Sequence, residues 1–566
     1  MRVRALTALA AMAVLATLAA ACASIPESTP VKVVDENRGV AQEPTVGAPP
    51  AGLDELSVVR RFVEAGVSHT DAHKSARSYL TAEAAKTWND ADEISIVEDQ
   101  FDTSPMDQSA PDADRRRKVV LRTRQLGRLN QEGVFRSDRR EVPYDITLTK
   151  EGGEWRIAKP PAGLLLRITD FRSTYRVVDL PYVDATSNVL VKDRRWILNR
   201  PASALPGRVV GLLLGDPSPD LTGAVINELR GARLLTNVAQ AADNVLTVNL
   251  TGLQQLNETQ RELAAAQLAR GVGEVVDQPV RILVDGDVLT PRQPQWRRED
   301  VKRFEPSFEV PADLPALVVA DGRVVQIGSD LPVDGSWLPN VVSVGQSTDS
   351  RKFAVVAAEP GGQRLWVGPA GALKPVPLLA PTLSKPNWRR GRGEVWVVAG
   401  GDRVVSVLAS DDVPVVQPVD ASELTRQGRV TALRLSRDGV WVAAIVNNTL
   451  VLGSVVGSGT GLSIRNVHTL APPNPTQMVD VDFLGSDVVV AATASRDTPV
   501  YEVSIDAQSW RPFDTSNLTP PISGIAAVSG RPVLVADQYG VWSALTAASV
   551  WQSTRRGANA VPVYPG

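Results

Sequence analysis

Cysteine is almost absent from this chain, because Cys22 is the only one among 566 residues. No disulfide can therefore link two parts of the chain, and each domain must be stabilised by its own buried apolar surface. Histidine is nearly as scarce, since His69, His73 and His468 are the whole set. This scarcity leaves few candidates for a histidine metal ligand or a histidine general base.

The chain also lacks a surplus of charge of either sign. Sixty basic residues stand against 63 acidic ones, which gives a formal net charge of −3. No long block of one sign occurs, so the composition argues against a nucleic-acid partner held by a basic surface. After Cys22 the sequence contains no apolar run that suggests a membrane-spanning segment.

The apolar run that does occur lies at the start of the chain. It follows Arg2 and Arg4, extends over roughly 15 residues and ends in small residues directly before Cys22. This pattern is typical of a secretory signal, and small residues before a lone cysteine resemble a bacterial lipobox. The resemblance implies that Cys22 becomes the first residue of the mature chain and carries N-palmitoyl and S-diacylglycerol groups. The alternative is a plain secreted protein whose signal happens to contain a cysteine.

The length of the chain predicts three or four domains at about 150 residues each. After Cys22, the residues up to about 53 are rich in proline, glycine and small polar residues, so they cannot bury enough apolar surface to fold. We expect a signal peptide at 1–21, the lipidated cysteine and a tether at 22–53, and folded domains at 54–160, 174–290 and 300–566.

The first folded region combines helical and strand patterns. Residues 53–66 and 72–88 have helical spacing, and strand-like runs follow at 94–98, 118–122, 142–148 and 154–157. Two or three helices before a curved antiparallel sheet resemble an NTF2-like α+β domain, for which we expect a spacer role rather than a catalytic one. His69 and His73 are four residues apart, a spacing that could pair on a metal, although solvated residues at a helix end are the expectation.

The second region has strand patterns around two helical stretches, near 208–217 and 257–270. Its order is similar to the GerMN α+β domain of spore-germination and cell-envelope proteins. Asp184, Asp285 and Arg194 could form a polar site there, but turn-forming aspartates and a solvated arginine are the expectation. The matching segments are Tyr182-Val183-Asp184, Leu190-Val191 with Arg194, Leu213-Leu214-Gly215-Asp216-Pro217, Val248-Asn249-Leu250 and Ile282 to Gly286.

From about residue 295 the chain repeats a unit of strand, polar turn and strand. The turns lie near residues 348, 390, 437, 485 and 530, a spacing of about 42 to 48 residues. A period of this length with several strands in each unit predicts an all-β propeller, here of about six blades. The clearest copy is centred on Ser436-Arg437-Asp438-Gly439, and the hairpin at 317–327 is expected to complete the last blade.

Catalytic patterns are hard to find in this sequence. Residues 456–461 match neither a nucleophile elbow nor a dinucleotide-binding loop, and His468 stands alone in an expected propeller loop. Trp296, Trp337 and Trp388 could line a face of the propeller, although core packing explains most of the tryptophans. We therefore expect no catalytic residue, no cofactor and no metal site, while a pair of carboxylates converging in the propeller funnel stays open.

The order of these parts resembles the LpqB family of actinobacterial lipoproteins over the whole chain. The resemblance implies a non-enzymatic protein, anchored by lipid to the extracytoplasmic side of the cell membrane. Its implied partner is the extracytoplasmic domain of the sensor histidine kinase MtrB, within the MtrA–MtrB two-component system that influences envelope homeostasis and division. The alternative is an envelope protein that binds or processes cell-wall glycan through the propeller funnel.

Overall fold

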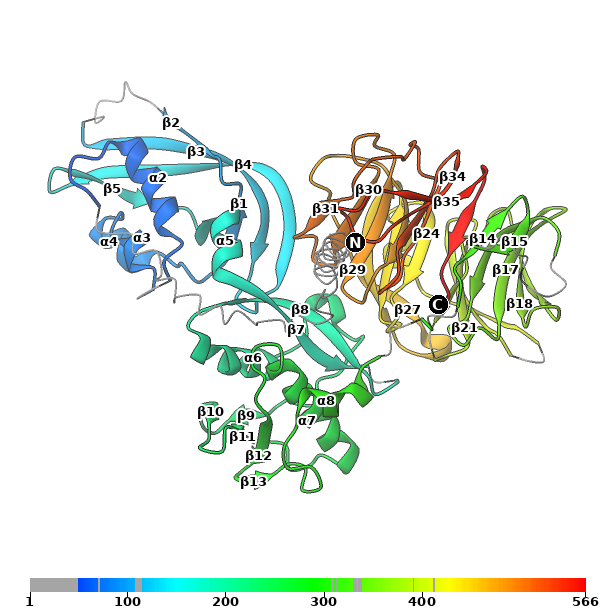
Figure 1. Ribbon diagram of the computed structural model, residues 1–566. Coiled ribbons are helices and arrows are strands. Elements are labelled where there is room, and N and C mark those ends of the chain that lie inside the picture. Colours follow the sequence, from blue (N-terminus) through cyan, green and yellow to red (C-terminus); the bar gives the residue numbers. More distant parts are fainter. Residues whose placement is uncertain are drawn as a thin grey trace, which may run out of the picture. The chain divides into compact units, whose positions relative to one another are not determined.

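The computed structural model describes residues 49–69, 72–106, 114–184, 186–306, 310–311, 314–328, 333, 338–389, 391–410 and 413–566. Within these ranges Figure 1 shows a first region of helices and long strands, a second mixed region and a third region made of sheets.

The first region opens with helix α2 (Glu55–Ala65). Asp54 caps this helix because its side chain accepts a hydrogen bond from the Ser57 amide over 2.7 Å. The buried face of α2 includes Val59 and Phe62, which pack toward the sheet, as the helical spacing predicted. The sheet has the order β5-β4-β3-β1-β6, with β2 on β3. Its strands are β1 (Ile94–Val97), β2 (Asp102–Met106), β3 (Arg116–Leu129), β4 (Phe135–Glu151), β5 (Glu154–Lys159) and β6 (Leu164–Arg167).

The prediction of a single helix over residues 72–88 is wrong. The structure has two short helices instead, α3 (Lys74–Arg77) and α4 (Ala82–Thr87). Between them Leu80 forms a β-bridge with Ile157 on β5, and Thr81 caps α4 by accepting from the Ala84 amide. The backbone hydrogen bonds that a continuous helix would need are therefore used by the sheet and by the cap.

The second region begins with α5 (Ile168–Thr174) and the antiparallel pair β7 (Tyr175–Val183) and β8 (Leu190–Leu198). Helices α6 (Leu205–Leu213) and α7 (Glu258–Val272) correspond to the two predicted helical stretches. Asn257 caps α7 in a capping box with Gln260. A small sheet of order β10-β11-β12-β13, with β9 on β11, completes the region: β9 (Arg233–Leu234), β10 (Ala239–Gln240), β11 (Leu246–Thr251), β12 (Val280–Val284) and β13 (Asp287–Val288).

From Leu317 onward the described residues form one three-stranded antiparallel sheet and five four-stranded antiparallel meanders. The four-stranded sheets are β16 (Val341–Gln346), β17 (Phe353–Glu359), β18 (Gly362–Gly368) and β19 (Lys374–Ala380); β20 (Asn387–Arg389), β21 (Glu394–Ala399), β22 (Arg403–Leu408) and β23 (Val415–Pro418); β24 (Val430–Leu435), β25 (Trp441–Val446), β26 (Thr449–Val456) and β27 (Ser463–Thr469); β28 (Met478–Phe483), β29 (Val488–Thr493), β30 (Val500–Ser504) and β31 (Trp510–Pro512); and β32 (Gly524–Ala526), β33 (Val533–Ala536), β34 (Gly540–Ala544) and β35 (Gln552–Arg556). This is the β-propeller that the repeat predicted.

The three-stranded sheet closes the ring. Strands β14 (Leu317–Ala320) and β15 (Arg323–Gln326) form the expected hairpin, and β36 (Val561–Val563) near the C-terminus pairs with β14. Figure 1 shows this as the red strand beside the green β14 and β15. The two ends of the propeller sequence thus share one sheet, which removes an exposed sheet edge at the closure.

Candidate functional site

The one site residue predicted from the sequence, Cys22, lies outside the described residues, as do the signal segment and most of the tether. Among the residues that are described, no helix has both the length and the apolar character needed to cross a membrane. The same residues contain no cluster of three or more His, Cys, Asp or Glu side chains arranged to hold a metal ion.

Two carboxylates lie on β28, the first strand of its propeller sheet. Asp480 Oδ2 is 2.5 Å from Lys385 Nζ and accepts a hydrogen bond from the Ile525 amide over 2.9 Å. Lys385 also donates to the Ile525 carbonyl oxygen over 3.2 Å. This partly buried contact joins three sheets, because Lys385 lies two residues before β20, Asp480 lies on β28 and Ile525 lies on β32, the first strand of the next sheet.

Asp482, two residues further along β28, has a similar set of partners. Its Oδ2 accepts from the Ala527 amide over 2.9 Å, and its Oδ1 lies 3.7 Å from Arg434 Nε. Burial raises the pKa of Asp482, and the charge of Arg434 opposes that rise. The cavity that Asp482 lines has a volume of only about 20 Å³, far below the ~300 Å³ at which ligand pockets begin. Both carboxylates thus tie strands together.

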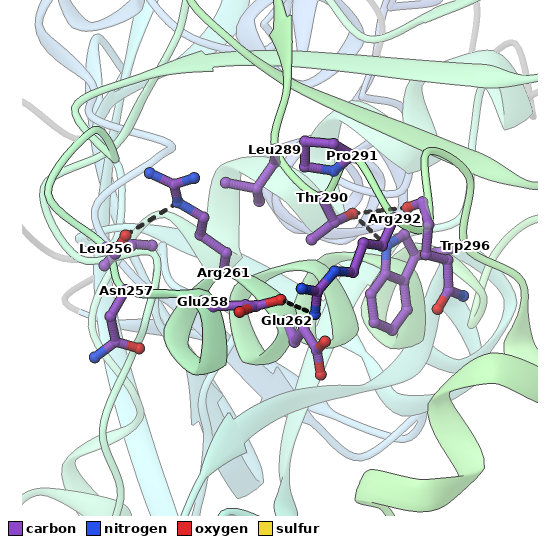
Figure 2. A pocket seen from close by; sticks show the side chains of 11 residues that line it. Leu256, Asn257, Glu258, Arg261, Glu262, Leu289, Thr290, Pro291, Arg292 and Trp296 are labelled. Atoms are coloured by element: carbon purple, nitrogen blue, oxygen red, sulfur yellow. Dashed lines mark hydrogen bonds and ion pairs between the residues drawn. The ribbon is translucent and has the colours of Figure 1, made fainter.

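A larger hollow of about 420 Å³ lies in the second region, between the start of α7 and the segment after β13 (Figure 2). Arg292 reaches across it to Glu258 over 2.5 Å, and Arg261 Nε donates to the Leu256 carbonyl oxygen over 3.0 Å. Trp296 forms one wall and donates its indole N–H to Thr290 over 2.9 Å. Because Arg292 and Glu258 are largely exposed, this pair contributes at most ~1 kcal/mol.

A second hollow, of about 390 Å³, is lined by residues of the first and second regions. On one side His73 links two groups: its Nδ1 lies 2.7 Å from Asp90 Oδ2, and its Nε2 lies 2.9 Å from His69 Nδ1. Burial alone would raise the pKa of Asp90, but the hydrogen bond from His73 and the charge of Arg77 lower it below its usual value. Asp90 is therefore an acceptor, and His73 Nδ1 carries a proton.

His69 ends this chain of hydrogen bonds. Burial, and then the positive charges of His73 and Arg208, lower the pKa of His69 to about 4. Its Nε2 is buried and has no hydrogen-bond partner among the described residues. The expectation that His69 and His73 are solvated is therefore wrong, although His73 does lie at a helix end, as the N-cap residue of α3. Ala72 and His73 have left-handed backbone conformations, so the two histidines do not share one helix.

The opposite wall of this hollow comes from β7, β8 and α6, and includes Tyr175, Trp196 and Arg208. The Trp196 amide donates to the Gly133 carbonyl oxygen over 2.8 Å. Gly133 has a φ of 74°, and a Cβ there would lie 2.5 Å from the Trp196 carbonyl oxygen, so this close approach requires glycine. The two regions are thus in direct backbone contact at the edge of the hollow.

Ion pairs link the second region to the propeller. Arg194, expected to be solvated, instead lies 3.2 Å from Asp487 and 3.4 Å from Asp506. Trp196 donates its indole N–H to the same Asp506 carboxylate over 2.9 Å. Apolar packing accompanies these pairs, because one buried cluster contains residues of the second region and of the propeller strands β25 to β30.

A second group of charges joins all three regions at Asp220. Its Oδ1 lies 2.5 Å from Arg136 on β4 and 3.3 Å from His468 on β27. His468 therefore lies on a strand, and the expectation of a propeller loop is wrong. It is not placed as the base of a serine nucleophile, since its described partners are Asp220 and the Asn466 carbonyl oxygen.

The other residues considered from the sequence do not converge on one site. Asp184 accepts from the Thr186 amide and hydroxyl, which is the turn that was expected. Asp285 adopts a left-handed conformation in its turn and accepts from the Gln254 side chain. Trp296 and Trp388 are buried, so neither lines an exposed propeller face, while Trp337 is outside the described residues.

Sequence reasoning missed the partners of the histidines. Asp90 is 17 residues from His73, and Arg208 lies in another region, so no local pattern connects them. The one available signal was the His-x3-His spacing itself, whose helical interpretation failed because the backbone turns at Ala72 and His73.

Comparison with known protein families gives one match for each region. The model described as "Lipoprotein LpqB, N-terminal domain" matches residues 48–172, "Sporulation and spore germination" matches 180–290, and "Lipoprotein LpqB beta-propeller domain" matches 322–565. Each match coincides with one of the three regions described above.

Comparison with individual proteins gives the same result over nearly the full length. The chain is 28% identical to Lipoprotein LpqB of Rhodococcus opacus, covering 97% of this chain and 96% of that protein, and 29% identical to Lipoprotein LpqB of Nocardia farcinica, covering 96% of each. Among solved structures, the β-propeller domain of Myceliophteria thermophila Cps50 (Swd1) is 10% identical, covers 43% of this chain and 83% of that chain, and has a TM-score of 0.31, on which no argument rests. Since two LpqB-specific models and near full-length relatives agree, the chain belongs to the LpqB family of lipoproteins.

Proposed function

We propose that this protein is a non-enzymatic accessory lipoprotein, held on the extracytoplasmic side of the cell membrane, that binds and modulates the MtrB sensor kinase of the MtrA–MtrB system. Lipid attached to Cys22 would anchor it. The near full-length relatives that carry the name lipoprotein support the anchor. In this proposal the first region is an NTF2-like spacer and the propeller has six blades, in agreement with its six sheets among the described residues.

The observation that carries a binding role is a group of exposed apolar side chains on the outer propeller strands. Leu408 at the end of β22 is paired with Val415 at the start of β23, and Val413 lies beside them. Val413 is 65% exposed, and Leu379 on the adjacent outer strand β19 is also exposed. We name Leu379, Leu408, Val413 and Val415 the apolar edge. Clustered exposed apolar residues of this kind are typical of protein-binding surfaces.

The propeller centre gives no comparable support for glycan chemistry. A glycosidase needs two carboxyl groups that can reach a sugar, one as acid and one as base or nucleophile. Asp480 and Asp482 are instead engaged by Lys385, Arg434 and backbone amides, beside a cavity too small for a sugar. We therefore favour the partner role over the glycan alternative.

The proposed mechanism is a shift of population. A protein that binds one conformation of the kinase ten-fold more tightly than the other changes their ratio by up to ten-fold, equivalent to ~1.4 kcal/mol. Each buried methylene of an acyl chain contributes ~0.8 kcal/mol to membrane binding, so two or more chains give a stable anchor. The anchor confines the protein to the surface where the kinase receptor domain lies and raises its effective concentration there.

The test is photo-crosslinking in cells, with a photoreactive phenylalanine analogue placed at Val413. Tyr539, 61% exposed in the turn between β33 and β34 of another propeller sheet, provides the matched control position. Each version is compared with the same version carrying Cys22→Ser, and captured partners are identified by mass spectrometry. The proposal predicts that MtrB is crosslinked from position 413 and that less MtrB is crosslinked from position 539. It also predicts that Cys22→Ser reduces the amount of MtrB crosslinked from position 413. Capture of cell-wall fragments only, independent of Cys22, would contradict it and favour the glycan alternative.

A further inference from the structure

The hollow between the first and second regions has the features of a ligand site. Its volume of about 390 Å³ is within the ~300–1,000 Å³ range of small-molecule pockets. The buried His69 Nε2, on its rim, has no partner among the described residues. A buried nitrogen without a hydrogen bond is unfavourable, and a ligand atom placed there would supply the missing hydrogen bond.

Two charged groups of opposite sign line the hollow, of which Asp90 is paired with Arg77 and His73, whereas Arg208 has no carboxylate partner among the described residues. Arg208 uses its Nη1 to donate to the Leu198 and Arg200 carbonyl oxygens, both over 2.8 Å. These contacts hold the side chain in place but leave the Nε and Nη2 donors without a described partner. Among the described residues, no carboxylate lies within ion-pair distance of Arg208. Burial lowers the pKa of this guanidinium, which is partly exposed to the hollow.

The remaining walls are mainly apolar. Tyr175 and Trp196 present rings, and Ile94, Leu129 and Leu212 present aliphatic side chains. His69 and Tyr175 meet edge to face, with ring centroids 5.6 Å apart. A ligand with a compact apolar or aromatic part could bury that part against these walls, and a single charged group on the same ligand could face Arg208.

We propose that this hollow binds an organic anion with an apolar, ring-sized body, whose charged group is held by Arg208 and by Nε2 of His69. The proposal concerns a site separate from the apolar edge and does not depend on the kinase. Because Trp196 also contacts Asp506 of the propeller, a ligand against its ring would lie where the three regions meet.

Proton balance follows from the hydrogen bonds. Asp90 accepts from His73 Nδ1, so His73 can accept at Nε2 from His69 Nδ1, and His69 Nε2 then has only a lone pair. To donate to an anion while its Nδ1 still donates to His73, His69 needs a second proton, on Nε2. Binding therefore takes up one proton, and anion affinity increases as the pH falls. The groups around this pair are Arg77, Asp90, Tyr175 and Arg208.

The scarcity of histidine makes a direct test possible. The full chain carrying Cys22→Ser is prepared without detergent and with ¹³C at the Cε1 carbon of histidine, so that His69, His73 and His468 give three separate signals. The probe is 1-anilinonaphthalene-8-sulfonate, and the neutral control is N-phenyl-1-naphthylamine, which has the same rings without the sulfonate. We expect saturable shifts of the His69 and His73 signals with the anion, an unchanged His468 signal and at least ~10-fold weaker binding of the neutral compound.

Two variants test the assigned contacts. Arg208→Gln removes the charge, and His69→Asn keeps an atom at the Nδ1 position while it removes Nε2, so each should weaken anion binding by ~10-fold or more. Arg261→Gln, in the other hollow, is the matched control and should bind as the parent does. If Arg208→Gln fails to fold, Leu212→Trp, which fills the hollow and keeps the arginine, should abolish binding.

The proposal is overturned if the anion leaves the His69 and His73 signals unchanged. It is also overturned if Arg208→Gln binds as tightly as the parent or if the neutral compound binds equally well. Equal shifts of all three histidine signals would mean that the probe adheres to the surface generally, which contradicts a specific site as well.

Discussion

Acidification should destabilise the first region through His69. In the folded protein the pKa of His69 is lowered to about 4, against 6.5 for an unperturbed histidine. The unfolded chain therefore takes up a proton first as the pH falls, and the free energy of unfolding decreases between about pH 6.5 and pH 4. Above pH 6.5 both states are neutral and the effect vanishes. Linkage gives a loss of about 2 kcal/mol between pH 7 and pH 5.

Two measurements test this value. In a pH titration followed by the Cε1 signals of histidine, one of the three should stay neutral to about pH 4. In calorimetry of the full chain, the transition that includes the first region should lose stability between pH 7 and pH 5, and His69→Asn should reduce that loss by about 2 kcal/mol because asparagine does not titrate. Titration of every histidine above pH 6, or an equal loss in the variant, would refute the reasoning.

Three further predictions concern stability. Asp480→Asn leaves the partly buried Lys385 ammonium without its charge partner and should lower the free energy of propeller unfolding by about 3 kcal/mol in denaturant titrations, whereas a small change would mean that the pair is well hydrated. A double-mutant cycle of Arg194→Ala and Asp506→Ala should give a coupling of about 1 kcal/mol between the second region and the propeller, and strict additivity of the melting temperatures would contradict the contact. Asn257→Ala removes the cap of α7 and should cost about 1 kcal/mol in the second region, and an unchanged transition would show that the cap is dispensable.

Much of the fold could be predicted from repeats and local periodicity in the sequence. The spacing of Val59 and Phe62 predicted α2, and the polar turn at Ser436 to Gly439 predicted the hairpin of β24 and β25. These features depend on neighbours along the chain, so the sequence displays them directly. The hairpin of β14 and β15 was predicted to complete the blade of the last repeat, but that repeat has four strands of its own and the hairpin pairs with β36 instead.

Features that depend on distant residues were not predictable in this way. The second predicted helix is interrupted in the structure because Leu80 forms a β-bridge with Ile157, which lies 77 residues further along the chain. Arg194 looked like a solvated charge, yet it meets Asp487 and Asp506 of the propeller. Tertiary contacts of this kind override local propensity, and the sequence around Leu80 and around Arg194 contains no pattern that predicts them.

The most direct test of the central claim is the effect of the protein on its proposed partner. Full-length MtrB in lipid nanodiscs is assayed for autophosphorylation with and without the lipidated full chain, and with a Val413→Asp and Val415→Asp double variant as the matched control. The account predicts that the parent protein changes the rate by at least about five-fold and that the double variant loses most of this effect. An unchanged rate, with both proteins in the same disc, would contradict it.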